Sequence, residues 1–239
     1  MQFKVTEEFW QLFPEAEIFL LTIDGLDNSP VEEWQDKADK MLKSAARDGL
    51  EFVPNEPISK NPVVEQWREA FRQFKTKKGA RSSIEALLKR VQKGSPVNSI
   101  NPLVDLYNMV SMRHAVPVGS EDLAKVSGDI RLDVAEGGES FLPLGAEEDS
   151  PSLPGEVGYF DNDGAICRCF NWREAQRTMI TEETETAVIV IEAINDEQKE
   201  RAQEAQNELA DLLAEHLDVT ASNHHLTVEN PYVDLNNEA

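Results

Sequence analysis

The stretch "NPLVDLYNMVSMRHAVPVGSEDLAKVSGDIRLDVAEGGESFLPL", residues 101–144, contains the change of periodicity that decides the fold class. Its first half predicts a helix, because Asn101 stands before Pro102 in the order that favours a helix start. Apolar side chains then recur at helical spacing, at Leu103, Leu106, Tyr107 and Val110. From residue 129 onward apolar and polar residues alternate instead, as they do along a strand. Helices followed by strands predict an α+β fold.

The residues after this stretch continue the strand pattern. We expect strands within 139–145, 155–170 and 186–194, and "DNDG" at 161–164 separates two apolar runs, which predicts a hairpin. A last helix is expected over 196–217, where apolar side chains again follow helical spacing. The C-terminal half should therefore form a mostly antiparallel or mixed sheet with one helix.

The residues before it are mostly helical. The patterns predict four helices, at 6–13, 29–49, 63–74 and 82–94. They also predict one buried strand, at 16–26. The helices at 29 and 82 each begin with a capping-box pattern, a serine followed three residues later by a glutamate. Because the chain has no internal repeat and no long linker, we expect one composite domain over residues 1–239, with the helical N-terminal half packed on the sheet.

The composition is typical of a globular protein with an acidic surface. The 239 residues are 40% hydrophobic and 28% charged, and the formal net charge is −22. The chain has no apolar run of about eighteen residues, and its first residues lack the basic and apolar regions of a signal peptide. We therefore expect a cytoplasmic protein that has no membrane partner. Cys167 and Cys169 should share one face of a strand as reduced thiols.

One segment departs from this acidity. Residues 60–93, the basic island, carry ten basic side chains and three acidic ones. Such an island can concentrate the attraction for an anion in one place. The simpler alternative is a pair of helices with solvated lysines. Because the charge on the rest of the chain opposes binding to polyphosphates, we do not expect DNA as a partner.

The familiar cofactor motifs are absent from the sequence. It has no Walker A loop, no G-x-G-x-x-G after a strand, no H-E-x-x-H and no paired C-x-x-C. His224 and His225 are adjacent, so in a strand they would face opposite sides and would bind one metal ion poorly. We therefore expect neither a metal ion nor a cofactor.

The quoted stretch and the residues after it resemble a known family. Five short motifs occur in the same order as in the editing domain of the phenylalanyl-tRNA synthetase β subunit, the B3/B4 domain. The spacings between them are also similar. The resemblance covers about residues 60–218. The matching residues are Val104, Asp105, Asn108 and Val110, then Pro117, then Asp122, Leu123, Lys125, Val126 and Gly128, then Gly138, Glu139 and Leu144, and finally Thr181, Thr184 and Glu192. The chain looks most like the free-standing members, because nothing in it resembles an aminoacylation module.

This resemblance implies a fold and a function. The fold would be of the B3/B4 editing-domain type. The protein would bind tRNA or aminoacyl-tRNA and hydrolyse a wrongly attached amino acid in trans, as a deacylase and not as a synthetase. The basic island would contact phosphates through Lys75, Lys77, Lys78, Arg81, Lys89 and Arg90. Two alternatives remain open: a non-catalytic module that keeps the fold and binds an amino acid or another small ligand, and a protein-interaction role without pocket chemistry.

The sequence departs from the family where the pocket is expected. Gly119 stands at the position of a pocket histidine, and "CRCFNWREAQ" at 167–176 replaces a glycine-rich wall. These departures predict a pocket re-lined by Arg168, Phe170, Asn171, Trp172 and Arg173, which would suit a small polar or acidic aminoacyl group better than tyrosine. The alternative is that the aromatic residues of this segment belong to the core and its arginines to the surface.

Hydrolysis of an aminoacyl ester needs hydrogen-bond donors for the oxyanion and a positioned water molecule. As catalytic residues we expect Asn108 and Thr181, with backbone amides near Gly119 as further donors. Glu192 lies in a strand apolar enough to bury it, and would act as the base or as the partner of the substrate's amino group. Thr184 would bind substrate beside Thr181. One pocket is predicted to gather Asn108, Gly119, Arg168, Asn171 and Glu192.

Overall fold

The computed structural model describes residues 1–235. The helices in this range are α1 Glu7–Leu12, α2 Trp34–Leu50, η1 Ile58–Lys60, α3 Pro62–Ala70, α4 Ser83–Gln92, α5 Pro102–His114, η2 Leu123–Lys125 and α6 Asp196–Leu217. The strands are β1 Gln2–Val5, β2 Glu17–Asp24, β3 Val118–Asp122, β4 Ile130–Val134, β5 Val157–Phe160, β6 Ala165–Arg168, β7 Arg173–Glu174, β8 Thr186–Ala193, β9 Ser222–Leu226 and β10 Tyr232–Asp234. None of these helices is long and apolar enough to cross a membrane.

The strands form two sheets, which confirms the predicted α+β class with mixed and antiparallel pairing. The six-stranded sheet has the order β10-β1-β4-β5-β6-β7, and the four-stranded sheet has the order β3-β8-β2-β9. Neighbouring strands are antiparallel except β1 and β4, which are parallel. β2 and β8 pair along their whole length and form the centre of the four-stranded sheet.

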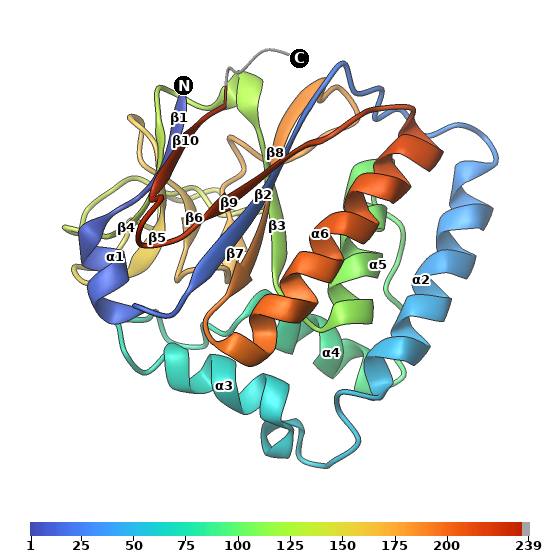
Figure 1. The fold of residues 1–239 in the computed structure, drawn as a ribbon, viewed down its shortest axis with the longest axis horizontal. Coiled ribbons are helices and arrows are strands. Elements are labelled where there is room, and N and C mark those ends of the chain that lie inside the picture. The colour runs from blue at the N-terminus through green and yellow to red at the C-terminus, as the bar shows by residue number, and fades with distance from the viewer. Residues whose placement is uncertain (236–239) are drawn as a thin grey trace.

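The two faces of the four-stranded sheet meet different partners. On β8, Ile189 and Ile191 belong to a core shared with α2, α5 and α6, whereas Val188 and Val190 belong to a core shared with the six-stranded sheet. Figure 1 shows α2, α5 and α6 side by side on one side of this sheet. The central strands are continuous apolar runs in the sequence because both of their faces are buried.

Side-chain caps fix the starts of two of these helices, α5 and α6. Asn101 accepts a hydrogen bond from the backbone N–H of Val104 at 3.1 Å, as its place before a proline predicted. Asn195 caps α6 in the same way, with the N–H of Gln198 at 3.0 Å. α5 is buried along nearly its whole length, since it packs against α2, α6 and β3.

One predicted helix start and one predicted capping bond are wrong. α2 begins at Trp34 and not near Ser29, so the serine pattern at 29 caps nothing. α4 does begin after Ser82, but that side chain makes no capping bond. The glutamate of this second pattern, Glu85, forms instead a salt bridge with Arg68 at 2.6 Å, which links α4 to α3.

The hairpin at 161–164 is confirmed, because β5 and β6 pair on either side of it. The strand expected at 139–145 is wrong. This segment is a loop with a single bridge from Pro143 to Ala175, since a proline offers no N–H to a ladder. β1 and β3 were not predicted, because β1 has only four residues and β3 is a polar edge strand, and neither carries much hydrophobic pattern.

Candidate functional site

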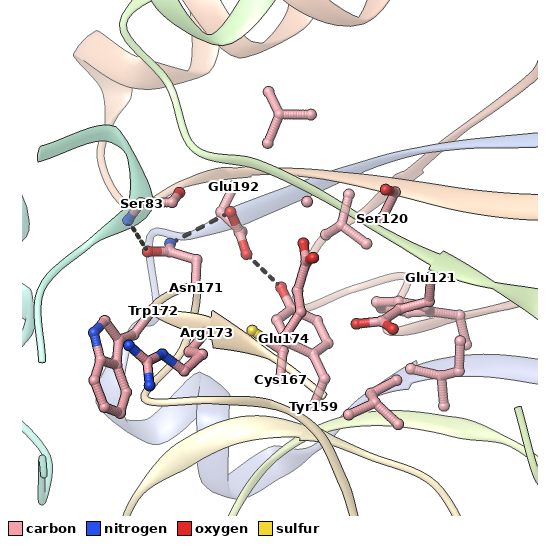
Figure 2. Close-up of a pocket in the computed structure, with 16 residues that line it drawn as sticks. Ser83, Ser120, Glu121, Tyr159, Cys167, Asn171, Trp172, Arg173, Glu174 and Glu192 are labelled. Carbon is pink, nitrogen blue, oxygen red and sulfur yellow. Dashed lines mark hydrogen bonds between the residues drawn. The ribbon is translucent and has the colours of Figure 1, made fainter. Parts of the chain in front are cut away.

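A cavity of about 170 Å³ lies between the two sheets. Its walls come from β3 and β8 of one sheet, from five strands of the other sheet, and from the first residue of α4. The lining is mostly apolar, and Figure 2 shows most of its polar side chains gathered around the same space: Glu121, Tyr159, Asn171, Glu174 and Glu192. Since ligand pockets usually measure about 300–1,000 Å³, this cavity has room only for a small group.

Glu192 reaches the cavity because of the alternation along β8. It follows Val188 and Val190 on the face turned toward the six-stranded sheet, and it is 2% exposed. Tyr159 Oη donates to Glu192 Oε1 at 2.8 Å, and Asn171 Nδ2 donates to Oε2 at 3.4 Å. Burial raises the pKa of Glu192 to about 8, although these two donors lower it. At neutral pH the carboxyl group is therefore mostly protonated.

Glu121 and Glu174 bring two more carboxyl groups to this space. They lie on β3 and β7, which are the edge strands of the two sheets. Burial raises the pKa of Glu174 to about 7. Burial and the charge of Glu174 raise the pKa of Glu121 well above its usual range. The Thr178 hydroxyl is close enough to oppose that rise, but within residues 1–235 Glu121 Oε2 has no partner in hydrogen-bond geometry.

A left-handed turn after β6 presents Asn171 and Trp172 to the cavity. Cys169 and Phe170 have φ values of 49° and 65°, a conformation that costs roughly 1–2 kcal/mol for each non-glycine residue. The Phe170 ring is fully buried, with its centroid 5.4 Å from that of Phe9. This aromatic packing holds the turn in place. Phe170 is therefore a core residue, whereas the two residues after it belong to the cavity.

The turn also separates the two cysteines. The strand ends at Arg168, so the common face predicted for the two thiols is wrong, and only Cys167 lines the cavity. Cys169 Sγ lies 3.4 Å from Glu156 Oε1 on the other side. Burial raises the pKa of Cys167 far above its usual range, and the three cavity carboxyl groups add to the rise. The thiol stays protonated and is poorly suited to nucleophilic attack.

A shallower depression of about 280 Å³ adjoins the cavity. The two hollows share Ser83 and Trp172, and the depression also contains Asn108 and Arg90. Arg173 lies over the ring of Trp172, with its Cζ atom 5.0 Å from the ring centroid. Figure 2 shows Trp172 and Arg173 at one end of the cavity. The site thus has an aromatic and basic mouth and an acidic interior.

Three of the five residues predicted to share a pocket line this cavity, namely Gly119, Asn171 and Glu192. Asn108 lies instead in the adjoining depression. A Cβ atom on Gly119 would lie 3.4 Å from Glu174 Oε1, so an alanine would contact this carboxyl group and a larger side chain would have to displace it.

Arg168 does not line the cavity, and the prediction that it re-lines a pocket is wrong. It alternates with Cys167 on β6, is 1% exposed, and forms a salt bridge with Glu156 at 2.5 Å. Its guanidinium also donates to the carbonyl of Ser150. The preference predicted for an acidic aminoacyl group loses this support, because the ionisable side chains deep in the cavity are carboxyl groups and not guanidinium groups.

Thr181 and Thr184 lie outside the cavity as well. Thr184 Oγ1 accepts from the Thr181 N–H at 2.9 Å and donates to Asp122 Oδ2 at 2.9 Å. The Thr181 carbonyl accepts from Asn28 Nδ2 at 2.7 Å. These bonds stabilise the turn before β8 and tie it to the end of β3. The position of the two threonines gives their predicted catalytic and binding roles no support.

The basic island lies beside the mouth of the cavity. A depression of about 420 Å³ contains Arg81 and Lys89 together with Ser82, which precedes the cavity residue Ser83. Arg90 lies in the depression next to the cavity. Within residues 1–235 none of the six candidate phosphate contacts forms a salt bridge with a carboxylate. The exposed turn before α4 holds the other three candidates, Lys75, Lys77 and Lys78.

Reasoning from the sequence missed several cavity residues, among them Glu121, Glu174 and Tyr159. Counting two residues along an extended chain from Gly119 would have found Glu121, because alternate residues share a face. Glu174 pairs with Cys167 across β6 and β7. Its place in the cavity could therefore be inferred only with knowledge of the strand register. Tyr159 gave no sequence signal that distinguishes it from a core residue.

Comparison with known proteins places the chain in a family. The model of the B3/4 domain matches residues 66–237, more than half of the chain, and the chain belongs to the B3/4 domain family. Among solved structures, it is similar to an N-terminal fragment of the phenylalanyl-tRNA synthetase β-subunit from Pyrococcus horikoshii, with 15% identity and a TM-score of 0.48 over 92% of this chain and 49% of that chain. The chain thus spans about half the length of that fragment. No curated protein matches the chain.

Proposed function

We propose that the protein binds aminoacyl-tRNA in the cytoplasm and hydrolyses the ester of a wrongly attached amino acid in trans, without charging tRNA itself. The observation that carries the proposal is the pair of adjoining hollows, a small acidic cavity that opens on an aromatic and basic depression. The end of an aminoacyl-tRNA carries its groups in the matching order. Its amino group and side chain would enter the acidic cavity, and its ribose, base and phosphates would lie in the aromatic and basic depression. Membership of the B3/4 family supports a tRNA-related role.

The depression suits the terminal nucleotide. The partly exposed ring of Trp172 offers a stacking face for a base, and Arg90 and Arg173 lie near it as donors for phosphate oxygens. The basic island then continues the positive surface from Arg81 and Lys89 toward the lysine turn. Its charge is available to the nucleic acid, since none of the six candidates is engaged in a salt bridge within the described residues.

The acid–base groups suit ester hydrolysis. Glu174 has a pKa of about 7, so near neutral pH it is ionised about half of the time, the condition that favours a general base. It would take a proton from water as the water oxygen bonds to the ester carbonyl carbon. The bond from that carbon to the ribose oxygen then breaks, and the ribose oxygen receives the proton. Asn108 at the mouth is the candidate donor to the oxyanion. Glu192, mostly protonated, is better suited to bind substrate than to act as the base.

A second candidate function is a non-catalytic module that binds a small amine or amino acid. The small volume of the cavity and the net charge of −22, which opposes a polyanionic partner, favour it.

A deacylation panel tests the proposal. Purified tRNAs, each carrying one labelled amino acid, are incubated with the protein, and the loss of label is compared with spontaneous hydrolysis. We expect acceleration of one or a few members by at least tenfold, most of it lost in Glu174→Gln. Glu182→Gln, on an exposed turn, should keep it. If no member of the panel is accelerated, the catalytic proposal is wrong and the binding module stands.

A further inference from the structure

One buried carboxyl group of the cavity has an oxygen without a hydrogen-bond partner. Glu121 lines the cavity and is 5% exposed, and its Oε2 atom makes no hydrogen bond to any described residue. It pairs with Val188, whose side chain faces the six-stranded sheet, whereas its neighbour Ser120 pairs with Ile189 on the face that the helices cover. A buried polar atom left without a hydrogen bond is costly and uncommon in folded proteins. This oxygen therefore marks a place where a ligand can supply the missing partner.

The cavity also lacks a cation of its own at this place. Arg173 is the one basic residue among the described residues that line it, and it lies over Trp172 at the mouth. Arg177 influences Glu121, but both of its terminal nitrogens donate to Asp161 at 2.8 Å. The negative charge that the carboxyl groups can develop therefore remains available to a ligand.

The chemistry of the missing partner follows from the groups present. Figure 2 shows the carboxyl groups of Glu121 and Glu174 turned toward the same space. Carboxylates only accept hydrogen bonds, and an ammonium group supplies three donors and a positive charge. No group of His, Cys, Asp and Glu side chains in residues 1–235 is arranged to hold a metal ion. The group sought is therefore an organic cation.

The size and lining of the cavity restrict the rest of the ligand. An engineered apolar cavity of about 150 Å³ holds one benzene molecule, so about 170 Å³ has room for a stem of a few carbon atoms and a small head. Apolar walls for such a stem come from Ile130, Ile166 and Val190. An indole on the same stem would be too large.

We propose that Glu121 and Glu174 form a subsite for a primary ammonium group on a short unbranched apolar stem, as in lysine or ornithine. The ligand is a free amino acid or amine, as in the second candidate function, because Glu174 cannot both hold the side-chain ammonium of an aminoacyl group and act on its ester several carbon atoms away. The preference for a cation arises from the carboxyl groups, and the limit on length arises from the cavity volume.

When the ammonium group binds in this subsite, the two carboxyl groups should release protons. In the empty cavity burial raises the pKa of both carboxyl groups, that of Glu174 to about 7. The ammonium group stabilises the ionised forms, so its affinity should rise with pH as these groups lose their protons. The other titratable or charged groups that act on this pair or line the same cavity are Tyr107, Tyr159, Asp161, Cys167, Arg173, Arg177 and Glu192.

Calorimetric titration of the full chain with free L-ornithine, L-lysine and L-norleucine tests the subsite without tRNA. Norleucine keeps an unbranched stem and lacks the ammonium group. We expect at least tenfold tighter binding of ornithine or lysine than of norleucine. Glu121→Gln and Glu174→Gln should each reduce that preference at least tenfold, and Glu182→Gln should not. A thermal melt checks that each variant is folded.

The possible results separate this inference from the proposed function. Equal binding of norleucine and lysine, or a preference that survives in both glutamine variants, overturns the subsite. Deacylation of tRNAs that carry only uncharged side chains, together with no binding of lysine or ornithine, overturns the subsite and leaves the deacylase proposal standing. Binding of the cationic amino acids without deacylation of any tRNA supports the subsite and overturns the deacylase.

Discussion

Replacing Glu192 with glutamine should stabilise the protein at alkaline pH. Burial raises the pKa of Glu192 from 4.5 to about 8, so between these values the folded state holds a proton that the unfolded state releases. Because the folded state binds more protons in this window, the free energy of unfolding of the parent protein falls as the pH rises through it. One pKa unit corresponds to about 1.4 kcal/mol. Between about pH 5 and about pH 8.5 the parent should lose about 4 kcal/mol that the neutral variant retains.

The substitution removes the titrating group and keeps its contacts. A glutamine oxygen can accept from Asn171 Nδ2, and the glutamine amide can donate to Tyr159 Oη, which both donates and accepts. The variant and the parent should therefore differ little at about pH 5. Urea unfolding, followed by tryptophan fluorescence at the two pH values, measures the difference. Glu182→Gln, on an exposed turn, is the control and should change the stability by less than about 0.5 kcal/mol at either pH.

The pH dependence decides the outcome, because a general packing defect would act equally at both pH values. If the stability difference between Glu192→Gln and the parent does not change between about pH 5 and about pH 8.5, Glu192 titrates as an ordinary glutamate. The argument that this carboxyl group is held protonated between the two sheets would then be refuted. A variant less stable than the parent at about pH 8.5 would refute it as well.

Arg168→Ala should lower the free energy of unfolding by about 3–5 kcal/mol, because Glu156 is then left buried without its ionic partner. Urea unfolding measures this loss, the double variant with Glu156→Gln should recover part of it, and a fully stable single variant would contradict the buried pair. Gly119→Val should abolish ligand binding in calorimetry while the protein stays folded, since its branches would enter the space used by the Glu174 carboxyl group, and Gly119→Ala should bind more weakly than the parent but more tightly than the valine variant. Undiminished binding by the valine variant would show that the ligand lies elsewhere. Alanine at three exposed lysines of the basic island should reduce the slope of log affinity for tRNA against log salt by about 2.7 if all three contact duplex phosphates, or by about 2.1 for single strands, and an unchanged slope would count against this surface. The three are Lys75, Lys77 and Lys78.

The parts of the fold that follow local periodicity could be predicted from the sequence. The α+β class, the hairpin at 161–164 and the cap at Asn101 each depend on a few neighbouring residues. The burial of Glu192 was also predictable, since it continues an apolar strand. These features need no knowledge of which elements pack together.

The cavity could be predicted only in part, because its walls are set by distant pairings. The sequence placed the segment with Cys167 and Arg168 near the site, but adjacent residues on a strand face opposite sides, and only the second sheet decides which side is the cavity. Glu121 was missed because β3 is a polar edge strand that pairs on one side only. Edge strands of this kind are positioned by tertiary contacts with little help from their own hydrophobic pattern.

The left-handed turn at Cys169 and Phe170 lets the cavity wall that follows it accept substitutions but not insertions or deletions. Phe170 is packed among buried aromatic rings. Asn171 and Glu174 line the cavity because they follow Phe170 by one and four residues. A single substitution at residues 171–174 would change the size or charge of what the cavity accepts and leave the anchor intact. An inserted or deleted residue would instead carry the amide away from Glu192 and turn the Glu174 carboxyl group to the opposite face of β7. Ligand preference in this protein can therefore change one side chain at a time on a frame of constant length.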